Sequence, residues 1–207
     1  VMPDSVEEGT IVGMTEHIDF LQLRDFAVST ATRAAELIAA RRAELVAGDG
    51  IAAHTSTKSS DVDPVTEVDT ATEEFIATTI RTQRPGDGIF GEEGANVEST
   101  SGVTWIVDPI DGTVNFLYGV PDFAVSIGAE YQGRLVAGAV VNVARWRTYA
   151  AAAGQGATVT GPDGKAHPLQ CAHTKNPALA LVATGFGYDA QRRAAQAELL
   201  TKLCLLY

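Results

Sequence analysis

The sequence predicts an α+β fold in which a pair of helices precedes a meander of strands. Apolar residues recur at helical spacing over residues 18–46 and again over residues 67–83. Beyond Pro85 the pattern changes to short apolar or alternating runs, separated by turns of glycine, proline and aspartate. Helices first and strands afterwards favour a layered domain whose sheet packs on the helix pair, rather than a regular alternation of strands and helices.

The two helices are predicted from periodicity and from the residues that flank them. The first is expected to end at Gly48 and Gly50 and to bury Phe20, Leu23, Phe26, Ala27, Ala31, Ala34, Leu37 and Ile38. Residues 54–64 are rich in Ser, Thr and Asp without an apolar period, which predicts a loop. The second helix is expected to bury Val68, Ala71, Phe75, Ile76 and Ile80.

Strands are expected wherever a short apolar or alternating run lies between turn residues. Pro162, Asp163 and Gly164 form a tight-turn signature, which predicts a hairpin around them. The expected strands lie at residues 88–90, 103–107, 123–130, 135–143, 148–153, 157–160, 166–169 and 179–184. A further helix is expected over residues 190–203.

Composition narrows the classes of protein to which the chain can belong. A hydrophobic content of 45% is typical of a globular domain. A net charge of −11 argues against non-specific electrostatic binding to nucleic acid. No apolar run approaches the roughly 18 residues of a membrane helix, and the first 20 residues lack the pattern of a secretory signal. We therefore expect a cytoplasmic protein with no membrane contact, a mobile leader at residues 1–17, and buried thiols at Cys171 and Cys204.

The most informative segment is Trp-Ile-Val-Asp-Pro-Ile-Asp-Gly-Thr-Val-Asn-Phe at residues 105–116. An apolar strand places Asp108 at its end, Pro109 is expected to form a turn, and Asp111 precedes a short helix that opens with Gly112 and Thr113. Two carboxylates this close repel each other unless a cation lies between them, and an all-oxygen ligand set favours Mg²⁺ or Mn²⁺ over zinc. The alternative is that both aspartates simply cap the helix.

Two further segments carry acidic residues, and each also has a simpler explanation. Gly-Glu-Glu-Gly at residues 91–94 follows a short apolar run, but adjacent acids in a loop are usually only solvated. Residues 58–69 begin with Lys58, run from a loop into a helix and end with Asp69. The alternative for that segment is a polar loop followed by helix capping, with Thr66 and Glu67 near the helix start.

Together these three segments resemble the signatures of the inositol monophosphatase family, the lithium-sensitive, metal-dependent phosphatases. The Asp-Pro-Ile-Asp-Gly-Thr segment is the specific one, and the resemblance extends over residues 24–196. Residues 114–128 look most like the monophosphatase branch. The resemblance implies a layered α/β/α/β/α sandwich and Mg²⁺-dependent hydrolysis of a small phosphate monoester by a metal-activated water, with myo-inositol 1-phosphate as the expected substrate.

The resemblance also implies a role for each residue that matches the family's motifs. Glu92, Asp108, Asp111 and the backbone carbonyl of Ile110 would bind two or three Mg²⁺ ions, for which Mn²⁺ can substitute. Asp69 and Thr113 would orient and deprotonate the attacking water, Glu92 and Lys58 would act near the metals, and Asp111 with the amides of Gly112 and Thr113 would contact the phosphate.

The sequence departs from the family near its end. Neither Trp105 nor Trp146 is followed by the aspartate of the family's late Trp-Asp pair. We expect an N-terminal metal-binding part at 18–175 and the start of a C-terminal part at 176–207, incomplete because residues after Leu203 are missing, with a truncated product as the alternative. A homodimer is expected, and the alternatives for function are histidinol phosphate or another sugar phosphate as substrate, or a regulatory, RNA-associated protein on the same fold.

Overall fold

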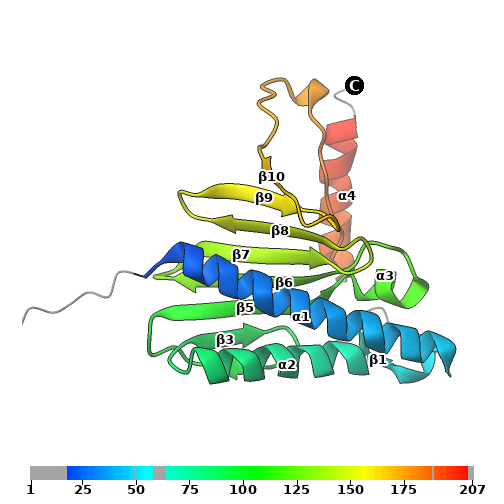
Figure 1. Ribbon diagram of the computed structural model, residues 1–207. Helices are drawn as coiled ribbons and strands as arrows, with labels where there is room; N and C mark the ends of the chain where they lie inside the picture. The colour runs from blue at the N-terminus through cyan, green and yellow to red at the C-terminus, as the bar shows by residue number, and fades with distance from the viewer. Residues whose placement is uncertain (1–17, 49, 58–63, 188, 205–207) are drawn as a thin grey trace, which may run out of the picture.

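The computed structural model describes residues 18–48, 50–57, 64–187 and 189–204 (Figure 1). The predicted leader at 1–17 and the predicted site residue Lys58 lie outside these described residues. No helix among the described residues has the length and apolar character needed to cross a membrane.

Both predicted helices are present with nearly the expected bounds. α1 spans Phe20–Ala47, and the side chain of its N-cap residue Asp19 accepts a hydrogen bond from the amide of Leu21 at 2.9 Å. α2 spans Glu67–Gln83 and begins with a capping box made by Thr66 and Asp69. Five of the eight predicted residues of α1 are buried, whereas Phe20, Phe26 and Leu37 are half-buried. In α2, Val68, Ile76 and Ile80 are buried as predicted, Phe75 is half-buried and Ala71 is exposed, and polar side chains share the buried face.

The strands form one mixed sheet of eight, in the order β10-β9-β8-β7-β6-β5-β3-β4. β3 and β5 are parallel, and the other neighbouring strands are antiparallel. The bounds are β3 Gly88–Gly91, β4 Asn96–Val97, β5 Val103–Asp111, β6 Ala124–Tyr131, β7 Arg134–Asn142, β8 Arg147–Ala152, β9 Gly156–Thr160 and β10 Ala166–Leu169. A short helix, α3, spans Thr113–Tyr118 directly after β5.

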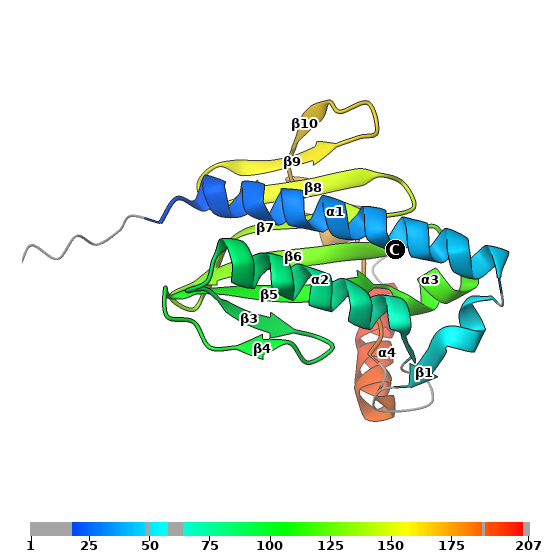
Figure 2. The ribbon, with the colours of Figure 1, turned by 60° about the horizontal axis from the view of Figure 1, so that its bottom comes forward.

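The two long helices cover one face of this sheet, as Figure 2 shows. α1 packs on β6, β7 and β8, and α2 packs on β5 and β3. Alternate residues of β5, Val103, Trp105 and Val107, point into this layer and are buried, with Trp105 fully inaccessible. The α+β prediction, with the sheet packed on the helix pair, is therefore confirmed.

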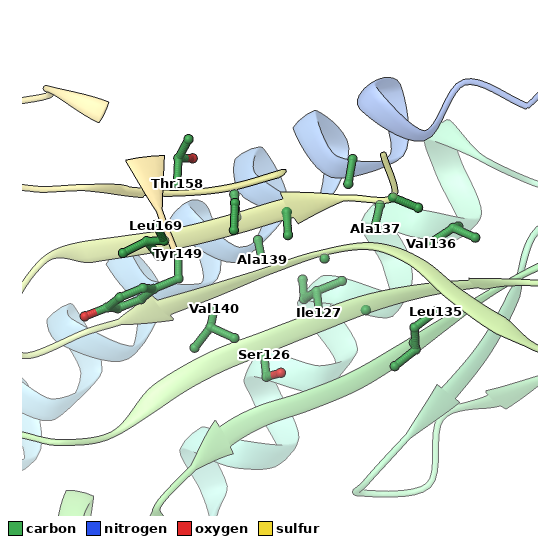
Figure 3. Close-up of a pocket in the computed structure, with 17 residues that line it drawn as sticks. Ser126, Ile127, Leu135, Val136, Ala137, Ala139, Val140, Tyr149, Thr158 and Leu169 are labelled. Carbon is green, nitrogen blue, oxygen red and sulfur yellow. The ribbon is translucent and has the colours of Figure 1, made fainter. Parts of the chain in front are cut away.

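The other face of the sheet has an apolar hollow of about 470 Å³ (Figure 3). Leu135, Val140, Tyr149 and Leu169 are among the side chains that line it, and each is more than one third exposed. α4, which spans Ala190–Cys204, lies on this side of the sheet, away from α1 and α2, and none of its described residues is buried. The hollow contains none of the predicted site residues.

Three further local predictions, all outside the candidate site, are wrong. In the part of the predicted loop that the structure describes, residues 54–57 and 64, a 3₁₀ helix at Ile51–His54 leads into β1 (Thr55–Thr57), which pairs antiparallel with β2 (Pro64–Thr66). Residues 179–184 form no strand; a 3₁₀ helix at Pro177–Leu179 precedes irregular, largely exposed chain, and no strand among the described residues pairs with it. Cys171 and Cys204 are exposed rather than buried, because their segments do not pack into the core.

Candidate active site

A β-bulge places Asp108 and Asp111 on the same face of the sheet. The expected turn at Pro109 is instead part of β5, which continues to Asp111. Asp108 pairs with Ser126 of β6 and Asp111 pairs with Ala124, so two residues of β5 lie opposite one residue of β6. Side chains alternate along a strand, so a spacing of three would put the two aspartates on opposite faces. The extra residue in the bulge restores them to one face, the face that α1 and α2 leave uncovered.

Glu92 comes to the same face from the neighbouring strand. Gly91 is the register partner of Val107 in the parallel pair β3 and β5, and the amide of Glu92 donates to the Val107 carbonyl at 3.1 Å. Glu92 therefore lies beside Asp108 at the carboxyl ends of two parallel strands. Phe90, two residues before Glu92, is exposed on this face, and Glu92 is exposed as well.

Asp69 and Thr113 contact each other, as expected for a pair that acts together. The Thr113 hydroxyl lies 3.2 Å from Asp69 Oδ1 and 3.1 Å from the Ile110 carbonyl oxygen, so it has two acceptors for its one hydrogen. Asp69 is 1% exposed, and its other carboxylate oxygen accepts from the amide and the hydroxyl of Thr66. Helix capping is thus present at Thr66, the N-cap residue of α2, with Asp69 as the second member of its capping box. The other carboxylate oxygen of Asp69 remains directed at Thr113.

The residue that caps α3 is Gly112, so Asp108 and Asp111 do not occupy the capping position. Gly112 has φ 90°, a left-handed conformation that favours glycine. A Cβ at this position would lie 3.1 Å from the Asp122 carbonyl oxygen. The backbone conformation and the close approach of residue 122 together explain why glycine occupies this position.

Glu73 is a residue near the site that the sequence analysis did not single out. It lies one helical turn after Asp69 on α2, is 3% exposed, and accepts hydrogen bonds from the amides of Glu93 and Ala95. The signal in the sequence was the spacing of four residues from Asp69, which puts both carboxylates on the same face of the helix. An acidic residue at a buried position of an amphipathic helix needs a partner, and its partners here are in the turn that follows β3.

The residues expected to bind a metal therefore lie on adjacent segments of the backbone. Among the described residues, no group of three or more His, Cys, Asp or Glu side chains is arranged closely enough to hold one. The donors themselves, three carboxylates and one carbonyl, are the oxygen ligands that Mg²⁺ prefers. The ligand set of Glu92, Asp108, Asp111 and Ile110 remains a prediction, chemically suited to that ion.

Comparison with known proteins gives the family of the chain. The Mycobacterium tuberculosis protein named inositol-1-monophosphatase SuhB is 49% identical over 188 residues, which cover 86% of this chain and 64% of that protein. The Pseudomonas aeruginosa Nus factor SuhB is 40% identical over 129 residues, which cover 61% of this chain and 46% of that protein. Among solved structures, Mycobacterium tuberculosis SuhB is 42% identical with a TM-score of 0.72, over 89% of this chain and 66% of that one.

The chain thus spans slightly less than two thirds of the length of the relatives that match most of it. Within that span, the model of the inositol monophosphatase family matches residues 19–205. This match includes every predicted site residue, and the matched structures share the arrangement of helices and sheet described above. The chain belongs to the inositol monophosphatase family.

Proposed function

We propose that this chain forms the metal-binding part of a Mg²⁺-dependent phosphatase that hydrolyses a small phosphate monoester, with myo-inositol 1-phosphate as the substrate. The observation that carries the proposal is the convergence at the carboxyl ends of β3 and β5. Three acidic residues share one face there, and the contact between Asp69 and Thr113 lies immediately beside them. The name of the Mycobacterium tuberculosis relative supports this choice of substrate.

The proposed ligands are Glu92, Asp108, Asp111 and the Ile110 carbonyl, with two or three Mg²⁺ ions at the site. Bound Mg²⁺ lowers the pKa of water and offsets negative charge on the phosphate oxygens. The Ile110 carbonyl has two lone pairs, so acceptance of the Thr113 hydrogen bond leaves it able to bind a cation. Lys58, outside the described residues, is proposed to contribute positive charge close to this group.

Asp69 and Thr113 are proposed to orient and deprotonate the attacking water. With its hydrogen directed at Asp69, the Thr113 oxygen presents its lone pairs to a water molecule and can accept a hydrogen bond from it. Asp69 is fixed by its bonds to Thr66, so the acceptor does not need to reorganise as a proton leaves the water. This pair therefore sets the direction from which water approaches.

The phosphate is proposed to lie at the junction of β5 and α3. Gly112 is the N-cap of α3 and Thr113 is its first residue, positions at which backbone amides have no acceptor within the helix. These amides would hold phosphate oxygens and stabilise charge that develops in the transition state, and Asp111 would contact the substrate alongside them.

A regulatory function is a second candidate, because one matched relative is named a Nus factor. The net charge of −11 is unfavourable for non-specific electrostatic binding to RNA, which requires clustered Lys and Arg. The complete acidic set instead favours the enzyme. We further propose a cytoplasmic homodimer, and measurement of the molar mass by light scattering tests the dimer.

A panel of phosphate esters tests the proposed function. The protein is incubated with myo-inositol 1-phosphate, histidinol phosphate and other sugar phosphates at fixed Mg²⁺, and released inorganic phosphate is measured with and without EDTA. We expect hydrolysis that requires the metal and is fastest for the inositol ester. Preference for histidinol phosphate would reassign the substrate, and the absence of metal-dependent hydrolysis of any ester would reject the phosphatase proposal.

A further inference from the structure

Glu73 is a buried carboxylate bound to the turn that follows β3. Its Oε2 accepts from the Glu93 amide at 2.7 Å, and its Oε1 accepts from the Ala95 amide at 2.8 Å. Burial of a carboxylate is unfavourable unless its oxygens are hydrogen-bonded, so both bonds are needed to keep this side chain in the interior. Glu73 thereby connects α2 to the turn at two of its residues, on either side of Gly94.

This turn carries Glu92, whose backbone is fixed on both sides. The Glu92 amide donates to the Val107 carbonyl of β5, and the next amide, that of Glu93, donates to Glu73. A further bond from the Gly91 amide to the Ala95 carbonyl, at 2.9 Å, closes the turn. The direction in which Glu92 projects therefore depends on β5 at one peptide and on Glu73 at the next.

Gly91 is required by the same contact. A Cβ on Gly91 would lie 2.5 Å from Glu73 Oε2 and 2.6 Å from its carboxyl carbon, closer than real Cβ atoms approach. The backbone of Gly91 is not in the left-handed region, so its glycine is explained by space rather than by conformation. Gly91, the first glycine of the Gly-Glu-Glu-Gly segment, thus leaves the space that the Glu73 carboxylate occupies when it binds the turn.

We infer that Glu73 is a positioning residue that directs Glu92 toward the metal, an inference that rests on the metal-binding role proposed for Glu92. α2 then holds both halves of the site with two carboxylates one turn apart. Asp69 binds Thr113, at the junction of β5 and α3, while Glu73 binds the turn after β3. Because both carboxylates belong to α2, this one helix holds the turn after β3 and the junction of β5 and α3 in fixed positions relative to each other.

Direct measurement of metal binding tests this role. Mn²⁺ is added to the protein and the free ion is followed by electron paramagnetic resonance, with Mg²⁺ as competitor, well below the unfolding temperature. In Glu73→Gln the amide nitrogen of the new side chain faces a backbone N–H, so one bond to the turn is lost. We expect Mn²⁺ affinity to fall about 10- to 100-fold, the usual effect of removing a group that orients a ligand, and turnover to fall with it.

Gly91→Ala is the second variant, because it displaces the Glu73 carboxylate without altering it, and it carries the test if Glu73→Gln does not fold. Glu74→Gln changes the exposed neighbour on α2 and should leave Mn²⁺ affinity unaltered. Asp87→Asn is the control for stability alone. Asp87 is also a buried carboxylate, but it accepts from Trp105 Nε1 at 2.8 Å, before the start of β3. The Asp87→Asn variant should therefore unfold at a lower temperature than the parent but bind Mn²⁺ with the same affinity.

The outcomes separate this inference from the proposed function. Weaker Mn²⁺ binding in both Glu73→Gln and Gly91→Ala, with normal binding in Asp87→Asn, supports it. If the two variants unfold at lower temperature but bind Mn²⁺ like the parent, Glu73 is merely structural and the inference is rejected while the phosphatase proposal stands. If the parent itself neither binds Mn²⁺ nor hydrolyses phosphate esters, the proposed function fails and this inference fails with it.

Discussion

Removal of the Thr113 hydroxyl is the most direct perturbation of the proposed water-activating pair. In Thr113→Val the side chain keeps its shape, but Asp69 Oδ1 loses a donor at 3.2 Å. Asp69 is 1% exposed, so solvent does not readily replace that donor. Hydrogen bonds to charged groups contribute about 1.5–3 kcal/mol, and we expect the free energy of unfolding to fall by about that amount.

The effect on turnover should be larger than the effect on stability. A positioned acid or base contributes about 10²- to 10⁴-fold to rate, and Thr113→Val removes the group through which Asp69 is proposed to act. We expect kcat to fall by about this factor. The Mg²⁺ concentration needed for half-maximal activity should change little, because the Thr113 hydroxyl is not a proposed ligand. Both quantities come from initial rates of phosphate release over a grid of Mg²⁺ and substrate concentrations.

Thr113→Ser is the matched control, because it keeps the hydroxyl and removes only a buried methyl group. That methyl group should contribute on the order of 1 kcal/mol to stability, while most of the parent's turnover is retained. The reasoning is refuted if Thr113→Val has a kcat close to that of the parent, or if the serine variant is as slow as the valine variant. Normal turnover at a much higher Mg²⁺ concentration would instead place Thr113 among the metal ligands.

Three further substitutions test the end of β5 and its junction with α3. Asp108→Asn and Asp111→Asn should each leave the circular dichroism spectrum intact and lower kcat about 10²- to 10³-fold. The reason is that several kcal/mol of transition-state stabilisation depend on the bound metal. Nearly normal turnover in either variant would disprove the ligand assignment. Gly112→Ala should lower the free energy of unfolding in urea by about 1–2 kcal/mol or more, because alanine at φ 90° is strained and its Cβ meets the Asp122 carbonyl. Unchanged stability would contradict this reasoning, because movement of the loop before β6 relieves only the contact with Asp122 and not the strain at φ 90°.

The elements that were predicted well are those whose signal is local. α2 was expected at residues 67–83 and has those bounds, because its capping box and its apolar positions are both in its own sequence. The hairpin around residues 162–164 follows from its turn residues in the same way. The segment at 179–184 shows the limit of this reasoning. An apolar run forms a strand only where another strand can accept its backbone hydrogen bonds, and the run itself does not reveal whether one is available.

Glu73 was missed because apolar periodicity treats the buried face of a helix as an apolar stripe. The buried face of α2 includes Asp69, Thr72 and Glu73, and each of the two acids has a partner far away in the chain. A search for acidic residues at the spacing of one helical turn finds Asp69 and Glu73 together. It does not find the amides of Glu93 and Ala95, because only the folded backbone brings them near.

The bulge at Pro109 shows why the Asp-Pro-Ile-Asp-Gly-Thr motif could be identified in the sequence while its backbone geometry could not be predicted from it. Strand periodicity alone would send Asp108 and Asp111 to opposite faces, which contradicts a shared cation. The contradiction is resolved only by the pairing of β5 with β6, where the single residue Val125 lies opposite Pro109 and Ile110. A proline suits that position, because it has no N–H to contribute to a sheet and is tolerated at bulges. Pro109, which was expected to form a turn, therefore lies in a bulge that gives β5 one residue more than β6 at this point. Because of that extra residue, the carboxylates of Asp108 and Asp111 reach the same face of the sheet.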